Sequence, residues 1–426
     1  MKRKTAFLVG LLTLAACSDP ATEQPAPAAA PPASDATVFE NARVIVGDGS
    51  VIENGSFVVA DGRFAEVGQT GAIDAPEGAT RVDLSGMTVM PAMVDTHVHL
   101  STERDPLIQD LRRRAYFGVG AALSLGADGT QAPLEVRGET IPGAARYRTA
   151  GRGITAPEPG RSEVPHWVTT VEEARAAVRE EAERGVDIIK VWVDDRNGMY
   201  EKLTPELYGA VIDEAHANDL RVTAHIFHLE DAKGLLRAGV DAFAHSVRDV
   251  DIDDEGLALF RERPGFVLIP NLPDRGVATD LSWLAGTVAA EQLQELQARA
   301  TDRPEVQQRF AVQGRNLAKL DDAGVRIAMG TDGSVPWAAH LEMEDMVAAG
   351  MTPAEVIVAA TRNSAELLRL DDVGTVATGM SADFVVLDAN PLDDITNTRR
   401  IDAVYLRGTA MHRDSVSARL IARPGA

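Results

Sequence analysis

Cysteine is almost absent from this chain: Cys17 is the only one among 426 residues. A single cysteine excludes an intrachain disulfide and a zinc site ligated by several thiolates. Basic residues are also in short supply, with 42 Lys and Arg against 64 Asp and Glu, for a formal net charge of −22. Because binding to nucleic acid requires a basic face, this balance argues against a nucleic-acid partner. We interpret the acidity as solubility in a salty or exposed compartment.

One apolar run stands out near the start, from Ala6 to Ala16, and it is too short to span a bilayer. It follows three basic residues and ends in Leu14-Ala15-Ala16-Cys17, the layout of a secretory signal peptide. This end resembles a bacterial lipobox, which implies that Cys17 is lipidated and becomes the mature N-terminus; Ser18 then favours the outer membrane. We predict a signal peptide over residues 1–16 and a lipid-anchored cell-envelope protein that faces the periplasm, with membrane contact only through Cys17.

The rest of the chain divides into segments that differ in composition and in the secondary structure that their patterns predict. Residues 17–36 are rich in Pro and Ala and predict an extended tether. Residues 37–90 and 375–426 show short alternating strands, separated by turn signals such as Asp48-Gly49 and Asp61-Gly62 in the first of them. We expect these two chain ends to combine into one small β-sandwich domain, which flanks a different middle over residues 91–374.

In the middle, apolar strands alternate with amphipathic helices. The segments 171–184 and 204–218 have helical patterns and run into the strands DIIKV and RVTAH, and the segment 230–238 links RVTAH to DAFAH. Such βαβα units imply parallel strands with crossovers. The predicted fold is therefore α/β, a TIM-like (β/α)8 barrel with the β-sandwich attached. Residues 280–320 are expected to be helical, with no chemistry assigned to them.

Six residues with metal-binding chemistry lie at or near the C-terminal ends of these strands, where such a barrel carries its catalytic groups: His97, His99, Lys190, His225, His245 and Asp332. His97 and His99 are two apart on a strand, so their side chains point the same way. His225 and His245 are one strand–helix–strand unit apart, so neighbouring strands would present both. Asp332 could be a turn or N-cap residue, but we favour a metal ligand that also shuttles the proton.

Lys190 follows two isoleucines in an apolar strand, where a charged ammonium is costly to bury. Its tip could instead reach water along the strand. With the other five residues in register, we favour a different role: burial lowers the pKa of the amine, and the neutral amine reacts with CO2 to give a carbamate that bridges two cations. Two divalent cations that share a hydroxide supply the nucleophile that hydrolysis of a stable bond requires.

Three further histidines are weaker candidates for substrate binding. His228 lies just beyond His225, His340 follows the last barrel strand, and His166 lies in a loop that could form the pocket rim. We expect His216 and His412 to be inert. Arg152, Arg161 and Arg275 could bind a substrate carboxylate, although a solvated loop charge is the simpler role for each.

The order His-x-His, Lys, His, His, Asp resembles the binuclear signature of the amidohydrolase superfamily. The resemblance spans about residues 37–411 and includes MPAMVDTHVHL, RVTAHIFHLEDAKGLLRAGVDAFAHS, IAMGTDGS and GMSADFVVLDANPL. It is strongest to the imidazolonepropionase-like and Xaa-Pro or Xaa-Arg dipeptidase-like subgroup. By that resemblance His97 and His99 bind one metal with Asp332, His225 and His245 bind the second, and N6-carboxylated Lys190 bridges them. Zinc is the expected metal, and many relatives form homo-oligomers.

The predicted activity is hydrolysis of an amide bond in a small molecule, such as a dipeptide, an N-acyl amino acid or a peptide-like xenobiotic such as ochratoxin. A mononuclear deaminase or a cyclic-amide hydrolase on the same fold remains an alternative, although such deaminases typically lack the lysine found here at position 190. A non-catalytic binding protein is a further alternative. Relatives of that kind generally lose metal ligands, whereas all six are present here.

Overall fold

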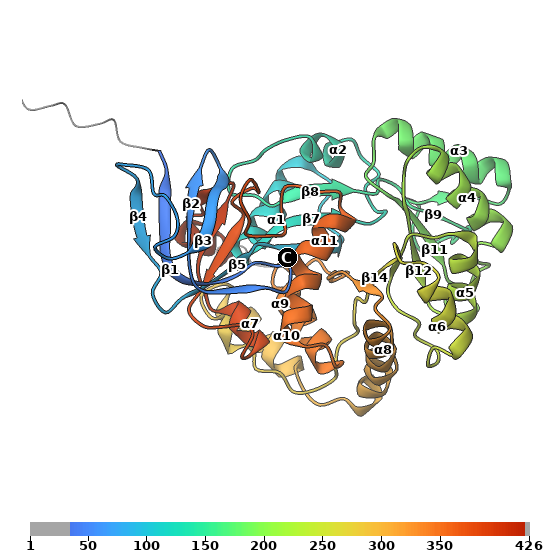
Figure 1. Cartoon of the computed structure of the whole chain (residues 1–426). Coiled ribbons are helices and arrows are strands. Elements are labelled where there is room, and N and C mark those ends of the chain that lie inside the picture. The colour runs from blue at the N-terminus through green and yellow to red at the C-terminus, as the bar shows by residue number, and fades with distance from the viewer. Residues whose placement is uncertain (1–34, 422–426) are drawn as a thin grey trace, which may run out of the picture.

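Both ends of the chain meet in one β-sheet, coloured blue and red in Figure 1. In the computed structural model, which describes residues 35–421, this sheet has eight strands in the order β18-β17-β16-β5-β1-β2-β3, with β4 paired to β1. The strands are β1 (Thr37–Ile45), β2 (Val51–Ala60), β3 (Arg63–Gln69), β4 (Thr80–Asp83), β5 (Thr88–Pro91), β16 (Phe384–Leu387), β17 (Ile401–Leu406) and β18 (Thr409–Ala410). The antiparallel pairing of β16 with β5 joins the two ends.

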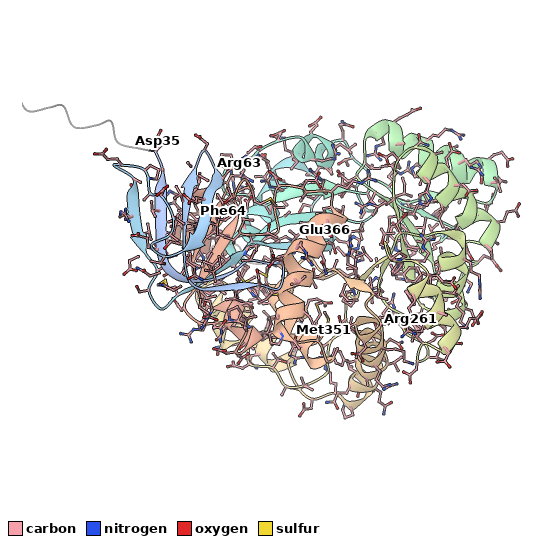
Figure 2. All side chains as sticks on the ribbon, viewed as in Figure 1. Asp35, Arg63, Phe64, Arg261, Met351 and Glu366 are labelled. Carbon is pink, nitrogen blue, oxygen red and sulfur yellow. The ribbon has the colours of Figure 1, made fainter. Side chains whose placement is uncertain are left out.

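A cluster of phenylalanines holds this β domain together. The rings of Phe39 and Phe57 stack with centroids 4.9 Å apart, and Phe384 meets both edge-on at 5.2 Å. Phe64, labelled among the strands in Figure 2, packs edge-on against Phe57 at 5.5 Å. All four side chains are buried, and such pairs stabilise beyond the apolar area they bury. The packed sheet thereby anchors β5, whose last residue lies directly before the barrel.

The middle of the chain forms the predicted barrel from eight strands: β6 (Met93–Val98), β7 (Val119–Ser124), β8 (Arg146–Thr149), β11 (Ile189–Val193), β12 (Val222–Ile226), β13 (Ala242–Ala244), β14 (Val267–Ile269) and β15 (Arg326–Ile327). From β6 to β8 and from β11 to β15, each strand pairs in parallel with the next. The ring closes through a parallel bridge between Val98 and Gly333 and a hydrogen bond from Asp187 N to Thr149 O. Two short strands, β9 (Ile154–Thr155) and β10 (His166–Trp167), pair beside β11.

Helices surround the barrel, as the green and orange ribbons of Figure 1 show. They are α1 (Arg104–Tyr116), α2 (Ala132–Arg137), α3 (Val171–Arg184), α4 (Pro205–Ala217), α5 (Leu229–Ala238), α6 (Asp254–Arg261), α7 (Ala290–Arg299), α8 (Pro304–Asp322), α9 (Ala338–Ala348), α10 (Pro353–Val358) and α11 (Ser364–Leu367). Their starts follow local chemistry: Thr170 and Glu173 form a capping box on α3, and Thr204 caps α4 before Pro205. The segment 280–320 is helical from Ala290 onward, after a single 3-10 turn (η1, Ser282–Leu284).

The end of the chain differs from the predicted β texture. After β18 the chain forms a helix, α12 (Arg413–Ile421), whose Arg413 stacks its guanidinium 4.4 Å from the ring centroid of Tyr116 in α1. The predicted signal peptide (1–16) and most of the tether (17–36), including Cys17, lie outside the described residues. Within residues 35–421, none of the helices has the length and apolar character that crossing a bilayer requires.

Candidate metal centre

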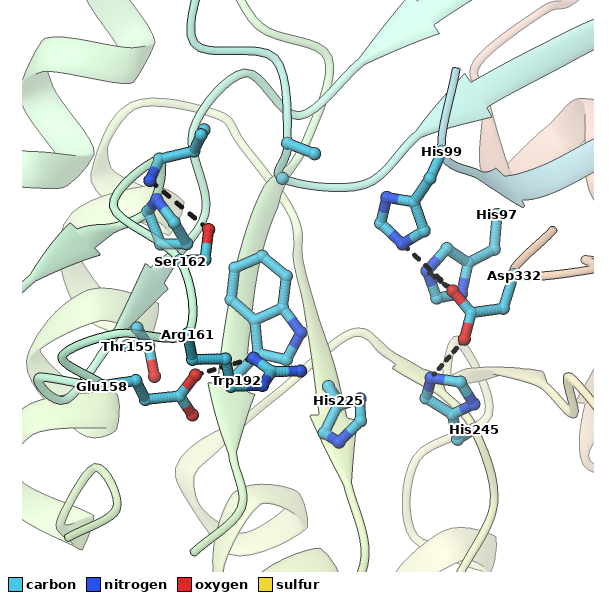
Figure 3. A pocket seen from close by; sticks show the side chains of 14 residues that line it. His97, His99, Thr155, Glu158, Arg161, Ser162, Trp192, His225, His245 and Asp332 are labelled. Carbon is cyan, nitrogen blue, oxygen red and sulfur yellow. Dashed lines mark hydrogen bonds and ion pairs between the residues drawn. The ribbon is translucent and has the colours of Figure 1, made fainter. Parts of the chain in front are cut away.

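Asp332 lies beside three of the predicted ligands, His97, His99 and His245, as Figure 3 shows. Its Oδ1 lies 3.2 Å from His97 Nε2 and 3.0 Å from His99 Nε2, and its Oδ2 lies 3.5 Å from His245 Nε2. Ligating atoms that share one tetrahedral zinc ion at about 2.0–2.1 Å are separated by roughly 3.3 Å. Each of the three imidazole nitrogens therefore lies near ligand spacing from the carboxylate of Asp332, and the ligand atoms of His97, His245 and Asp332 all lie within 4.8 Å of one another.

The protonation of these side chains also fits a cation. His97 Nδ1 donates to Asn271 Oδ1 at 2.9 Å, which turns the lone pair of Nε2 toward Asp332. Burial lowers the pKa of His97 and of His245 well below the ordinary histidine value, so both rings are neutral near pH 7. A neutral imidazole lone pair facing a carboxylate is repulsive unless a positive ion lies between them. The donor set thus fits a divalent metal.

The carboxylate of Asp194 orients the ring of His225. Its Nε2 lies 2.9 Å from Asp194 Oδ2, and the guanidinium nitrogens of Arg196 and Arg248 lie 3.0 Å and 3.3 Å from the same ring nitrogen. Burial, with further lowering by Arg248, brings the pKa of His225 to about 3. The rings of His225 and His245 lie with centroids 4.7 Å apart. These two neutral imidazoles lie on neighbouring strands and meet edge-on. They form a second pair of possible ligands.

Lys190 lies deeper in the barrel than its predicted place at the C-terminal end of its strand. It is the second residue of β11, and the register pairs it with Thr223, whereas Trp192 is the residue level with His225. The side chain is fully buried, and its Nζ has no hydrogen-bond partner among the described residues. Burial lowers the pKa of the amine to about 7. Buried polar groups are nearly always paired. An amine that is buried without a hydrogen-bond partner is therefore a candidate for chemical modification.

At three successive strand ends, a residue of the candidate site has a left-handed backbone conformation. After β13, β14 and β15, the residues His245, Asn271 and Asp332 have φ values of 83°, 43° and 52°. Such conformations are strained for residues with a Cβ and concentrate at functional sites. Gly330 allows the last strand to approach β6, because a Cβ there would lie 3.0 Å from the His97 nitrogen and 2.5 Å from Ile269.

A buried ion pair links the strand that carries His97 to the loop that carries Asp332. Arg114 of α1 donates from Nη1 to Asp95 Oδ2 at 2.9 Å and from Nη2 to the Gly333 carbonyl at 2.6 Å. Asp95 in turn accepts from Thr331 Oγ1 at 2.9 Å and from the Thr331 and His97 backbone nitrogens. The side chains of Asp95 and Arg114 are at most 1% exposed. This pair links β6, α1 and the segment after β15 directly beneath the ligands.

The ligands open into a cavity of about 350 Å³. Its far wall carries Trp192, Val164 and the charged pair Glu158 and Arg161, whose Oε2 and Nη1 lie 2.7 Å apart. Glu158 also accepts from Arg196 at 3.0 Å and is almost fully buried. The cavity is therefore lined by the candidate metal ligands on one side and by a charged and partly apolar wall on the other, as Figure 3 shows.

The weaker histidine candidates lie outside this cavity lining. His340 is completely buried, with its ring nitrogens 3.0 Å from Thr398 Oγ1 and from the Phe117 carbonyl, so the expectation that it contacts substrate is corrected. His166 turns its Nε2 to Glu181 at 2.8 Å, and His228 is half-buried with Nδ1 3.2 Å from Asp249.

Of the three arginines considered for a substrate carboxylate, only Arg161 lines the cavity. Arg275 pairs instead with Asp345 at 2.5 Å and Glu344 at 3.4 Å, and Arg152 bonds the Val164 carbonyl and Glu180. His216 pairs with Asp241 on the surface.

Asn271 and Asp194 orient His97 and His225, yet no sequence motif singles them out. Asn271 closes the strand FVLIPN, and Asp194 follows the strand of Lys190, so both occupy strand ends where a polar residue is itself a signal. Their positions at strand ends were the one sequence signal for a site role. The histidine that each of them contacts could be identified only from the structure.

A barrel whose strand ends gather histidines, a lysine and an aspartate defines a metal-dependent hydrolase of the TIM-barrel class. Residues 88–411 match the family model described as "Amidohydrolase family", and the chain belongs to that family.

Individual relatives fit the same assignment. The chain is 28% identical over 335 residues to the imidazolonepropionase of Streptomyces coelicolor, covering 74% of this chain and 81% of that protein. It is 29% identical over 260 residues to ochratoxinase of Aspergillus niger, covering 57% and 50%. A solved structure from Bifidobacterium longum, described as a candidate prolidase, superposes with a TM-score of 0.73 at 26% identity, covering 91% of this chain and all of that one.

Proposed function

We propose that this protein hydrolyses an amide bond in dipeptides, N-acyl amino acids or related peptide-like molecules, with two divalent metal ions held by His97, His99, Lys190, His225, His245 and Asp332. The observation that carries the proposal is the cluster around Asp332, where one carboxylate faces three imidazoles at ligand spacing. Zinc suits imidazole and carboxylate ligands. Divalent ions, when bound, supply an oxygen nucleophile strong enough for amide hydrolysis at neutral pH.

Asp332 is suited to move the proton. Burial alone would raise the pKa of this carboxyl, but interactions with His97 and His99 outweigh burial and hold the pKa below its ordinary value. The group is therefore ionised near pH 7 and can accept a proton from the attacking oxygen. It can then return this proton to the leaving nitrogen, because it lies in the cavity wall beside the ligands.

Lys190 favours two metals over one. Its amine is buried without a partner, and burial lowers its pKa to about 7, so a substantial fraction is neutral at physiological pH. A neutral amine reacts with CO2 to form a carbamate, with the C–N bond formed from the nitrogen lone pair and one amine proton released. The resulting anion would replace an amine without a hydrogen-bond partner by two oxygens that could serve as metal ligands.

Relatives suggest the substrate class. The names imidazolonepropionase and ochratoxinase both describe enzymes, and the Bifidobacterium longum protein is described as a candidate prolidase. All three names are consistent with cleavage of carbon–nitrogen bonds in small molecules. The cavity of about 350 Å³ is of a size for such a substrate.

Metal analysis combined with a substrate panel tests the proposal. The purified protein would be stripped with a chelator, reloaded with zinc and assayed on dipeptides and N-acyl amino acids with free or amidated carboxylates. We expect about two metals per chain, activity that returns with metal, and a loss on the order of 10²–10³-fold in kcat for Lys190→Ala. Less than one metal per chain after reloading, together with unchanged turnover in Lys190→Ala, would contradict the two-metal site.

We further propose that Cys17 anchors the protein to the cell envelope, on the periplasmic side of the outer membrane. The lipobox-like ending Leu14-Ala15-Ala16-Cys17 supports this. Labelling with a radioactive fatty acid should mark the wild type and leave Cys17→Ser unlabelled. Equal labelling of both proteins would refute the anchor without touching the hydrolase proposal.

A further inference from the structure

Asn271, the residue that orients His97, is not held in place by its own side chain. Its Oδ1 lies 2.9 Å from His97 Nδ1, but its Nδ2 has no hydrogen-bond partner among the described residues. Its backbone is left-handed, with a φ of 43°, and such a conformation persists only where the surrounding structure enforces it. The orientation that Asn271 gives to His97 must therefore be maintained by neighbouring residues.

The backbone beside Asn271 has few groups by which it can be held. Pro270 and Pro273 lack an N–H, so Asn271 and Leu272 carry the backbone donors of this stretch. The N–H of Leu272 donates to the carboxyl group of Glu342 in α9, with Oε1 and Oε2 at 3.0 Å and 3.2 Å. This N–H lies in the peptide plane that joins Leu272 to Asn271, so the hydrogen bond fixes the ψ of Asn271.

Glu342 has surroundings that are costly for an acidic side chain. The residue is only 5% exposed, and within residues 35–421 the N–H of Leu272 is the one hydrogen-bond partner of its carboxyl group. Burial, and next the charge of Asp345, raise the pKa of Glu342 well above the ordinary value, so the group is neutral near pH 7. A buried polar group is tolerated when it makes a needed hydrogen bond, and here that bond holds the segment after β14.

Helix α9 connects this support to the other side of the metal centre, because the chain runs from the loop of Asp332 directly into it. A second contact joins the same two segments: Arg275 Nε lies 2.5 Å from Asp345 Oδ1. Glu342 and Asp345 are three positions apart and therefore lie on one face of the helix. The segment of Asn271 is thus attached at two points to the helix that follows Asp332.

We propose that Glu342 is a positioning residue of the metal centre. Its carboxyl group holds the N–H of Leu272, which keeps Asn271 in its left-handed conformation and the ring of His97 in the orientation that binds a metal. The inference rests on the proposed metal site, because the orientation of this ring affects function only if the ring is a ligand. Glu342 does not line the cavity, so it acts through Asn271 and not on the substrate.

Substitutions at position 342 separate the hydrogen bond from packing. Glu342→Met keeps an unbranched side chain of similar length without the acceptor, whereas Glu342→Gln keeps an acceptor oxygen and resembles the neutral acid. His340→Gln, in the same helix but at a side chain that contacts Phe117 and Thr398, controls for a general disturbance of α9. If Glu342→Met does not fold, Glu342→Asp replaces it, because its shorter side chain draws the carboxyl group away from Leu272.

NMR signals of the histidine rings in the metal-free protein report on His97 directly. The chain has nine histidines, so the spectrum is sparse, and the signals lost in His97→Gln identify this ring. We expect the His97 signals to shift and broaden in Glu342→Met, and to match those of the wild type in Glu342→Gln and His340→Gln. Unchanged His97 signals in Glu342→Met would overturn the proposal.

Zinc affinity, measured by competition with a chromogenic chelator, gives the consequence for metal binding. Loss of a group that orients a ligand weakens binding about 10–100-fold, and we expect about tenfold for Glu342→Met. Glu342→Gln and His340→Gln should stay within about twofold of the wild type. Because Glu342 acts through Asn271, adding Glu342→Met to Asn271→Ala should lower the affinity no further. Additive losses, or a loss in Glu342→Gln equal to that in Glu342→Met, would overturn the proposal.

The two measurements distinguish this proposal from the metal site on which it rests. A wild-type protein that binds no zinc would refute the metal site. The spectra of the metal-free protein would still decide whether Glu342 positions His97, because they require neither bound metal nor turnover.

Discussion

Two buried cations in this barrel have opposite surroundings. Arg114 lies beneath the ligand loops and is held by Asp95 and the Gly333 carbonyl, with only its Nε left without a partner. Lys190 lies among the ligands and has no hydrogen-bond partner among the described residues. A buried charge with good partners fixes the position of neighbouring segments, whereas a buried amine without any is costly unless it is neutral or modified. Arg114 therefore stabilises the structure around the candidate site, whereas Lys190 is a candidate for taking part in its chemistry.

The largest expected effect lies on the chemical side. Asp332→Asn keeps the size of the side chain but removes the proton acceptor and one charge of the metal site. We expect a loss of about 10³-fold or more in kcat, measured by steady-state hydrolysis of the best substrate, with a midpoint of urea unfolding close to wild type in the metal-free protein. Retention of more than a tenth of the activity would exclude Asp332 as the proton carrier.

On the scaffold side, Arg114→Met should reduce stability. The change leaves Asp95 buried without its cation, which we expect to cost about 3–5 kcal/mol in the free energy of unfolding. Urea denaturation of the metal-free protein measures it. The double variant Arg114→Met with Asp95→Leu removes both charges and should recover much of the loss. If the double variant is as unstable as the single one, lost packing and not the stranded charge explains the defect.

Asp194→Asn should give an intermediate effect, because this residue acts through His225. An amide cannot orient the imidazole as firmly as a carboxylate does, so we expect metal affinity or activity to fall about 10–100-fold. Competition with a chromogenic chelator gives the affinity, and Asp195→Asn, at the neighbouring acid that bonds the Gly198 backbone, is the control. Equal effects of both variants would remove Asp194 from the centre.

Lys190 should also make the stability of the protein depend on pH. Burial lowers its pKa from 10.5 to about 7 in the folded protein. Between these values the unfolded chain binds more protons, so the metal-free protein loses stability as pH falls from about 10.5 toward 7, by at most about 1.4 kcal/mol per unit. Lys190→Met should remove this slope, whereas Lys202→Met, at a half-exposed lysine paired with Asp231, should retain it. Unfolding curves at several pH values decide between them.

The six candidate ligands could be proposed from the sequence because parallel strands bring their carboxyl ends to one face, so residue type and strand order together indicate a site. The depth of Lys190 was not readable, because the register between β11 and β12 depends on pairing across the whole sheet. Asn271 was missed since its role depends on a φ of 43° and on a contact with His97, 174 residues away.

His340 illustrates a different limit. A histidine soon after the last barrel strand has the position of a site residue, yet helix α9 turns it toward Phe117 and Thr398, between the barrel and the segment before β17. The helical end of the chain was likewise hidden behind the alternating strands that precede it. In both cases packing between distant segments, and not local pattern, decided the outcome.

The pairing of β5 with β16 has a consequence for how the protein is made. Val89 lies opposite Val386, so the first and last portions of the chain must both be present before this sheet can close. Contacts of such sequence separation slow folding, and until they form β5 presents an open edge to other chains. The β domain therefore cannot be completed until the C-terminal strands have been synthesised, and a chain that stops before Phe384 is expected to expose this edge of β5 and to aggregate more readily than the full chain.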